Sequence, residues 1–238
     1  MRKQLGKSSF QISLQTGNLQ KAKQEARFLC VKYQPICSLM QKEAYYQNIK
    51  AKWSSDYPSS NSIEEVWDFY RECGYKEPVV CFKRILNQIE WNKGKLLDFG
   101  CDNGLLLNYI CNLIPNINGY GIDINDNAIK KAKEAFSGIE FIPFSGTEIP
   151  FDDDYFDVIY MSAVLKHIRY EDRDHIYNEL RRVANKLFVV EIDSKKQEII
   201  SHQGWTFYHS HFEKELAENF IPIDTFNECG DLWGLYKL

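Results

Sequence analysis

The fold is decided by the stretch Lys95-Leu-Leu-Asp98-Phe-Gly100-Cys-Asp102-Asn-Gly104. A short apolar run ends in the acidic residue Asp98, two glycines follow within a loop, and an apolar helical pattern begins after Gly104. Glycine lets a backbone approach a ligand closely, and the helix N-terminus behind the loop favours negative charge. Ligands of open α/β sheets bind at the carboxyl ends of strands. The stretch therefore predicts a ligand site on an α/β fold.

Downstream of this stretch, short apolar runs alternate with helical patterns, which is typical of a parallel sheet covered by helices. We expect an α/β fold with a seven-stranded, mostly parallel sheet, helices on both faces and a hairpin-like edge at the end of the chain. Strands are predicted at 96–99, 120–124, 139–144, 156–161, 187–192, 221–227 and 231–238, and helices at 105–114, 128–136, 170–185 and 212–220.

Upstream, residues 1–92 read as a helical N-terminal extension, and 93–238 as the ligand-binding domain. A helical pattern starts near Asn18, and Pro35 is expected to interrupt it because proline lacks the N–H that continues a helix. Ser62 and Glu65 have the spacing of a capping box, which predicts another helix start. Pro78 suits the first turn of a further helix.

Composition narrows the classes of function. The 238 residues carry a net charge of −4, which gives no general attraction for nucleic acid or an anionic membrane. The seven cysteines show no CxxC spacing, so we expect reduced thiols in a cytoplasmic protein. We also expect no secretory signal and no membrane span, because no apolar run approaches the necessary length.

The glycine spacing argues against a dinucleotide site. The G-x-G-x-x-G pattern would need glycine at 100, 102 and 105, but Asp102 and Leu105 stand at two of these positions. A nicotinamide-dependent oxidoreductase is therefore the least favoured hypothesis.

The pattern resembles motif I of the class I S-adenosylmethionine (SAM)-dependent methyltransferases, [DE]-x-G-x-G-x-G. Other segments are similar to the family's motifs in the same order, over about residues 93–193: Gly119-Tyr-Gly-Ile-Asp123-Ile, Phe144-Ser-Gly-Thr-Glu-Ile-Pro-Phe151, Tyr155-Phe-Asp-Val-Ile-Tyr-Met161 and Ala163-Val-Leu-Lys-His167-Ile. The resemblance implies SAM as the cofactor.

The resemblance also implies roles for single residues. Asp123 would accept the ribose hydroxyls, although it could instead cap the next helix, and Asp98 would order the loop and the methionine end. Ile124 would contact adenine or pack in the core. The implied cofactor-binding residues are Asp98, Gly100, Asp102, Gly104, Asp123, Ile124, Ser145, Gly146, Thr147, Met161 and Ser162.

Two of these residues depart from the family pattern. Asp102 replaces the middle glycine; aspartate tolerates a left-handed backbone, and its charge would either oppose the cofactor's carboxylate or complement its cationic groups. Ser145 replaces an acid that usually accepts the adenine amino group.

Histidines supply the candidate base. His167 follows the fourth predicted strand, and His209 and His211 lie in an aromatic cluster after the fifth, where we expect a substrate-facing lid. Each could act as general base toward a hydroxyl or merely pack. No third metal ligand accompanies His209 and His211, so no metal is expected. Trp53, likewise, either roofs the cofactor or packs between helices.

The leading hypothesis is a SAM-dependent methyltransferase acting on a small molecule or glycan, with O-methylation preferred because of the histidines. The alternative is a degenerate methyltransferase fold that binds without catalysis, favoured by Asp102 and Ser145. Neither hypothesis includes a nucleic-acid or membrane partner, and both leave a homodimer open.

Overall fold

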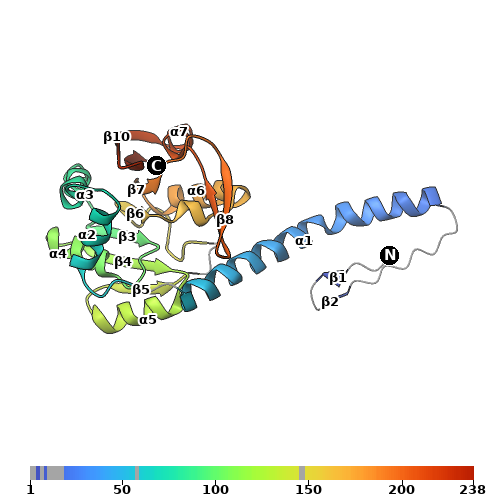
Figure 1. Ribbon diagram of the computed structural model, residues 1–238, viewed down its shortest axis with the longest axis horizontal. Coiled ribbons are helices and arrows are strands. Elements are labelled where there is room, and N and C mark those ends of the chain that lie inside the picture. The colour runs from blue at the N-terminus through green and yellow to red at the C-terminus, as the bar shows by residue number, and fades with distance from the viewer. Residues whose placement is uncertain (1–3, 6–7, 10–18, 57–58, 145–147) are drawn as a thin grey trace. The chain divides into compact units, whose positions relative to one another are not determined.

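The computed structural model describes residues 4–5, 8–9, 19–56, 59–144 and 148–238, and the chain divides into two compact units, Met1–Asn48 and Ile49–Leu238 (Figure 1). The first unit contains strands β1 (Gln4–Leu5) and β2 (Ser8–Ser9), which pair antiparallel. The predicted domain boundary at residues 92–93 stays a prediction.

Helix α1 spans Leu19–Asp56 without a break, so the predicted interruption at Pro35 is wrong. Proline removes one backbone donor from the helical ladder. That local loss is small beside the hydrogen bonds of a helix of 38 residues, which therefore continues through it.

The second unit is built on a seven-stranded sheet in the order β10-β11-β7-β6-β3-β4-β5. Five neighbouring strands, β3 to β7, run parallel, whereas β11 pairs antiparallel with both β7 and β10. This confirms the predicted mostly parallel sheet with a closing hairpin. The strands are β3 (Lys95–Phe99), β4 (Asn118–Asp123), β5 (Glu140–Pro143), β6 (Val158–Ser162), β7 (Lys186–Ile192), β10 (Ile221–Glu228) and β11 (Asp231–Lys237).

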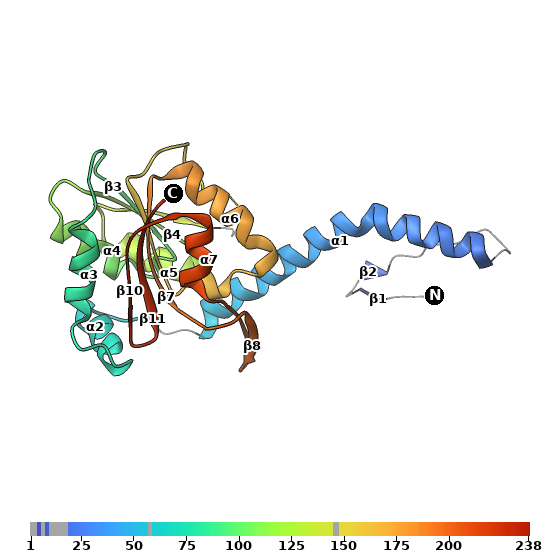
Figure 2. The same ribbon diagram turned by 90° about the horizontal axis from the view of Figure 1, so that it is seen from above.

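Helices cover both faces of this sheet. Successive strand residues point to opposite faces, so each strand contributes side chains to two cores. Leu97 belongs to the core under α6 (Tyr170–Val183) and α7 (Phe212–Asn219), and its neighbour Leu96 belongs to the opposite core. That second core lies under α2 (Ile63–Glu72), α3 (Pro78–Leu86), α4 (Leu105–Leu113) and α5 (Asp126–Ala135). Figure 2 shows α6 and α7 on one side of the strands, with α2 and α3 on the other.

The predicted helix starts at Ser62 and Pro78 are confirmed. Ser62 is the N-cap of α2, and its Oγ accepts a 3.2 Å hydrogen bond from the backbone N–H of Glu65. The Glu65 carboxylate turns to the N–H of Asn61 instead of that of Ser62, so the capping box is displaced by one residue. Pro78 is the first residue of α3.

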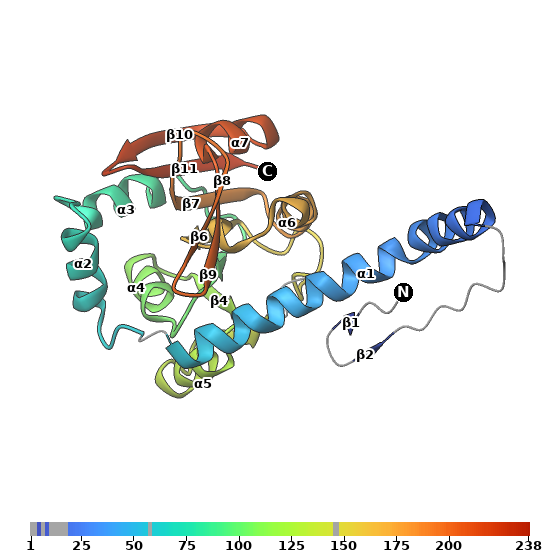
Figure 3. The ribbon, with the colours of Figure 1, turned by 45° about the vertical axis from the view of Figure 1, so that its right-hand side comes forward.

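Two short elements follow β6 and β7. The 3-10 helix η1 (Leu165–His167) comes after β6, and the hairpin of β8 (Glu198–His202) and β9 (Trp205–His209) comes after β7. Figure 3 shows this hairpin beside the C-terminal end of α1. Within the described part of the chain, no helix combines the length and apolarity that a bilayer span requires.

Candidate functional site

The glycine loop between β3 and α4 folds tightly at the carboxyl edge of the sheet. The backbone N–H groups of Gly100 and Cys101 both donate to the carbonyl oxygen of Ile122, at 2.8 and 3.1 Å. Gly100 and Gly104 have φ of 86° and 80°, and Asp102 has φ of 46°, which confirms that aspartate takes a left-handed conformation here. The loop therefore survives the loss of the family's middle glycine.

Packing against neighbouring side chains of the same domain also requires glycine at both loop positions. A Cβ at Gly100 would lie 2.4 Å from Cγ2 of Val164, and one at Gly104 would lie 2.6 Å from Cζ of Phe141. Both positions thus need glycine for backbone conformation and packing, whatever ligand approaches.

Three carboxylates influence one another at this edge. Asp98 is 2% exposed, and among the described residues none donates a hydrogen bond to it or pairs with it. Burial raises its pKa well above the usual range, and the charges of Asp123 and Asp102 raise it further. Burial also raises the pKa of Asp102, and that of Asp123 to about 6. A cationic ligand would relieve this repulsion, whereas an anionic one would add to it.

Asp123 is the last residue of β4, and its carboxylate connects the end of this strand to the glycine loop that follows β3. Its Oδ2 accepts a 2.9 Å hydrogen bond from the N–H of Asp102, and its Oδ1 accepts one of 2.8 Å from the N–H of Asn125. Asn125, not Asp123, caps α5, because its Oδ1 accepts from the N–H groups of Asn127 and Ala128. The alternative reading of Asp123 as a helix cap is thus wrong. Each of its oxygens has a further lone pair for a hydroxyl.

A segment from the end of α1, residues 52–56 and 59–60, lies across these loops; we call it the strap. Ser59 Oγ donates to Asp102 Oδ1 at 2.8 Å, and Asn103 Nδ2 donates to the Ser60 carbonyl at 2.6 Å. Asn125 Nδ2 donates to the Trp53 carbonyl at 3.0 Å. A cavity of about 340 Å³ remains between the strap and α5.

An aromatic cluster forms where the strap meets η1 and β9. The Trp53 ring centroid lies 5.3 Å from that of His167 and 4.8 Å from that of Trp205. Phe207 packs against both His167, at 5.2 Å, and His209, at 6.0 Å. All five side chains are half-buried. Two of the three predicted catalytic histidines, His167 and His209, are therefore brought together with Trp53.

Burial keeps these two imidazoles neutral. It lowers the pKa of His167 to about 3, with the charges of Lys166 and His209 lowering it further. Burial also lowers the pKa of His209. Such imidazoles accept hydrogen bonds at neutral pH, but a base with a pKa far below the working pH is weak.

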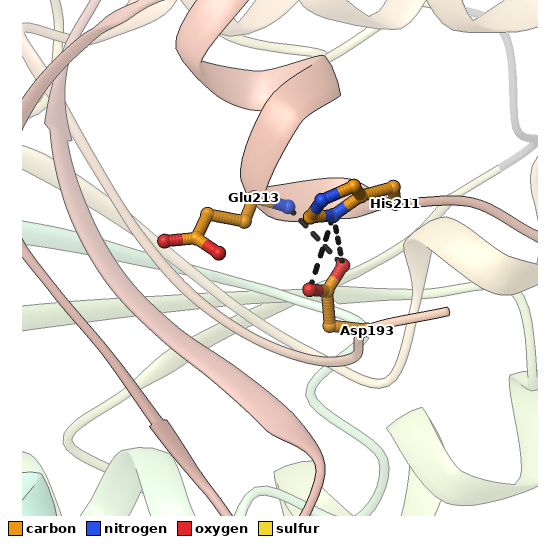
Figure 4. Close-up of side chains that lie close together, drawn as sticks. All are labelled: Asp193, His211 and Glu213. Carbon is orange, nitrogen blue, oxygen red and sulfur yellow. Dashed lines mark hydrogen bonds and ion pairs between the residues drawn. The ribbon is translucent and has the colours of Figure 1, made fainter. Parts of the chain in front are cut away.

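His211 lies apart from this pair and faces Asp193 after β7. Its Nδ1 is 3.2 Å from the Asp193 carboxylate, which also accepts the N–H of Glu213 (Figure 4). One ligand atom from each of Asp193, His211 and Glu213 lies within 4.8 Å of the others. This trio contains His211 but not His209, so the structure brings His211 together with two acids, Asp193 and Glu213, that the sequence did not reveal as candidate ligands. The Glu213 side chain is exposed, so this trio is an open surface group at the start of α7.

The other predicted residues divide between site and core. Met161 is fully buried in the core under α6 and α7, whereas Ser162 is half-buried and its Oγ lies 3.1 Å from the Tyr70 hydroxyl. Ile124 is half-buried beside Asp123. The predicted adenine segment Ser145, Gly146 and Thr147 lies outside the described residues.

Sequence reasoning missed the buried Arg173, which holds the histidine-bearing segments in place. Its guanidinium donates to the carbonyl oxygens of Leu165 in η1 and Tyr208 in β9, and pairs with Glu215 of α7 at 2.7 Å. An arginine inside a helical pattern predicts a solvent-exposed side chain, and only the folded structure shows that Arg173 is buried.

Comparison with known proteins shows what part of the chain is similar to. Residues 97–187 match the family described as "Methyltransferase domain". An uncharacterised protein of Methanocaldococcus jannaschii is 28% identical over 181 residues, which are 74% of this chain and 72% of that protein. The "Putative methyltransferase 235L" of Invertebrate iridescent virus 6 is 26% identical over 109 residues, and this match spans only 41% of its length.

Solved structures share the fold. A Pyrococcus horikoshii protein matches with a TM-score of 0.58 and 18% identity, over 78% of this chain and 95% of that one. The magnesium protoporphyrin IX methyltransferase of Synechocystis, solved with bound SAM, matches with a TM-score of 0.55 and 13% identity, over 81% and 96%. Residues 97–187 thus resemble a methyltransferase domain, and the chain shares the fold of these solved structures.

Proposed function

We propose that this chain is an active SAM-dependent methyltransferase that methylates a hydroxyl group of a small molecule or glycan. The observation that carries the proposal is the buried carboxylate of Asp98, to which no residue in the described part of the chain donates a hydrogen bond, beside Asp102 and Asp123; the pKa values of all three are raised. A buried charge without a partner is costly, so a site of this kind favours a ligand that supplies positive charge.

SAM fits this requirement because it carries a sulfonium, an ammonium and a ribose diol. Asp123 would accept the diol through the lone pairs left by its two backbone hydrogen bonds. Asp98 and Asp102 would face the cationic groups. A nicotinamide dinucleotide fits poorly, because its diphosphate would add negative charge to three carboxylates that already repel one another.

The bound cofactor would supply an activated methyl group, so the protein's task is to align the acceptor with it. His167 and His209 would accept a hydrogen bond from the acceptor hydroxyl, since burial keeps both imidazoles neutral. Trp53, Trp205 and Phe207 would exclude water from the same place. His211, paired with Asp193, remains a candidate base from the sequence.

The second candidate is a binding protein that holds SAM without transferring its methyl group. It is supported by the low pKa of His167, which makes this residue a weak base, and by Asp102, whose side chain is engaged with Ser59.

We also propose that the protein is cytoplasmic and forms a homodimer. Sedimentation measures the assembly state and tests the second of these proposals.

A labelled-methyl transfer screen tests the proposed activity. The chain is incubated with methyl-labelled SAM and pools of hydroxyl metabolites and glycans, alongside the Asp123→Ala variant as a binding-deficient control. We expect label in at least one acceptor with the wild type and much less with the variant. SAM binding without transfer to any pool would favour the binding protein.

A further inference from the structure

A histidine and two acids meet between β7 and α7. Asp193 directly follows β7, His211 directly precedes α7, and Glu213 is the second residue of that helix (Figure 4). One ligand atom of each residue lies within 4.8 Å of the other two. Imidazole nitrogens and carboxylate oxygens are donors that proteins use for divalent transition ions. The trio therefore has the donor set of a metal site, drawn from two separate segments of the chain.

The spacing of the first two side chains fits metal coordination as well as a hydrogen bond. Both carboxylate oxygens of Asp193 lie 3.2 Å from Nδ1 of His211. Two donors that are each about 2.1 Å from a tetrahedral Zn²⁺ ion stand roughly 3.4 Å apart. An ion can therefore enter between these two side chains with only a small outward movement. The Glu213 side chain is exposed, so it has room to rotate toward the same ion.

The backbone holds Asp193 and His211 in this arrangement. The N–H of Ser194, next to Asp193, donates to the carbonyl of Ser210, next to His211, at 2.9 Å. The Asp193 Oδ1 accepts the backbone N–H of Glu213 at 3.2 Å, and the Asp193 side chain is only 9% exposed. Two of the three donors are thus positioned before an ion binds, which reduces the entropic cost of binding.

A buried hydroxyl near the trio points to a ligand independently. Tyr236 is fully buried, and no residue in the described part of the chain is a hydrogen-bond partner of its hydroxyl. Burial raises the pKa of Tyr236, and the charges of Glu213 and Asp193 raise it further, so the hydroxyl lies within range of both acids. Buried polar groups are nearly always paired, with protein, water or an ion. Water bound to an ion at the trio would bring a partner toward this hydroxyl.

We propose that Asp193, His211 and Glu213 form a binding site for a divalent transition ion such as Zn²⁺ or Mn²⁺, with water completing the coordination shell. The ion joins the loop after β7 to the start of α7. An imidazole ligand favours such ions over Mg²⁺, which is bound mainly through oxygen. With its Nδ1 lone pair on the ion, His211 acts as a ligand and not as a general base.

Calorimetry with Zn²⁺, Mn²⁺ and Mg²⁺ on the chelator-treated chain, without SAM, tests the site. We expect about one ion per chain, with Zn²⁺ bound more tightly than Mg²⁺. Asp193→Asn, His211→Ala and Glu213→Gln should each raise the dissociation constant about tenfold or more, because loss of even an outer-shell partner costs about 10–100-fold. Glu218→Gln is the matched control, since it removes an exposed acid of the same helix that pairs with Lys214 at 3.8 Å.

Titration with Co²⁺ distinguishes this site from binding by cysteines. Co²⁺ held by nitrogen and oxygen donors absorbs in the visible range through d–d bands, and a thiolate ligand adds a charge-transfer band in the near ultraviolet. We expect the d–d bands alone in the wild type, because the three proposed ligands include no sulfur. The bands should weaken in Glu213→Gln at subsaturating Co²⁺ and stay unchanged in Glu218→Gln.

The alternative is a simple ion pair between Asp193 and His211, which needs no carboxylate from Glu213. No saturable binding of Zn²⁺, Mn²⁺ or Co²⁺ tighter than about 1 mM would overturn the proposal. Binding that Glu213→Gln leaves unchanged would also overturn it, as would a charge-transfer band at the saturable site. Circular dichroism verifies folding, and Glu213→Gln decides if either other variant fails to fold, because its side chain is exposed. The result is independent of the proposed function, since no cofactor is present.

Discussion

The carboxylate of Asp123 accepts a 2.9 Å hydrogen bond from the backbone N–H of Asp102. This bond fixes the end of β4 to the glycine loop after β3, so the two parts of the proposed cofactor site are positioned together. The side chain of Asp102 stays available for Ser59. A strand end, a loop and the strap are thereby connected through two aspartates.

Asp123→Ala is expected to weaken SAM binding without unfolding the chain. Loss of a charged acceptor of two hydroxyls should cost about 1.5–3 kcal/mol of binding free energy. Calorimetry measures the dissociation constant, and Asp126→Ala, which removes an exposed acid nearby that pairs with Lys50, is the matched control. An unchanged dissociation constant in Asp123→Ala would show that this carboxylate is not the ribose acceptor.

SAM affinity is expected to fall as the pH drops below about 6. Burial raises the pKa of Asp123 to about 6, so this carboxyl becomes neutral in the ligand-free site below that pH. The cationic cofactor binds the charged form better, so affinity is greatest above this pKa and declines below it, by at most about tenfold per pH unit for this group. Calorimetry from pH 5 to 8 measures the slope. The Asp123→Asn variant should have a flatter profile, and equal slopes would refute the assignment.

Substitution of His167 or His209 is expected to lower kcat while SAM binding stays intact. If one imidazole assists a hydroxyl acceptor, its loss should cost about 10²-fold in kcat or more. Because the pKa of His167 lies at about 3, protonation of His167 should leave no inflection near pH 6.5 in the rate profile. The test compares His167→Asn, His209→Asn and His211→Asn once an acceptor is known. Near-wild-type turnover in all three would leave alignment as the mechanism.

Gly104→Ala is expected to destabilise the fold, whereas Gly138→Ala is not. Gly104 has φ of 80°, and a Cβ there would lie 2.6 Å from the Phe141 ring, while one at Gly138 would meet nothing within 4 Å. Backbone strain and overpacking together should cost about 2–4 kcal/mol of unfolding free energy. Urea denaturation measures the difference. Equal midpoints for the two variants would mean that the loop adapts to a side chain.

The sheet and its helices could be predicted because periodicity reports burial residue by residue. Alternating apolar runs after residue 95 gave the strands, and local rules gave the cap at Ser62 and the left-handed Asp102. The β8–β9 hairpin was missed because its two-residue turn begins with Gln203 at φ 49°, where asparagine, aspartate or glycine is the usual signal.

The site could be predicted only in part, because its contacts join residues far apart in the chain. Ser59 meets Asp102 across 43 positions, and Trp53 meets Asn125 across 72. No periodicity connects such pairs, and the Ser- and Asp-rich run of residues 54–62 predicts only a loop. The low pKa of His167 likewise follows from burial, which the sequence near this residue does not reveal.

Isothermal titration calorimetry with SAM, S-adenosylhomocysteine and NAD tests most directly whether the site takes a cationic nucleoside cofactor. We expect saturable heat with SAM and with S-adenosylhomocysteine at about one site per chain and none with NAD, because three mutually repelling carboxylates disfavour a diphosphate. Binding of NAD together with no heat from SAM or its product would contradict the account.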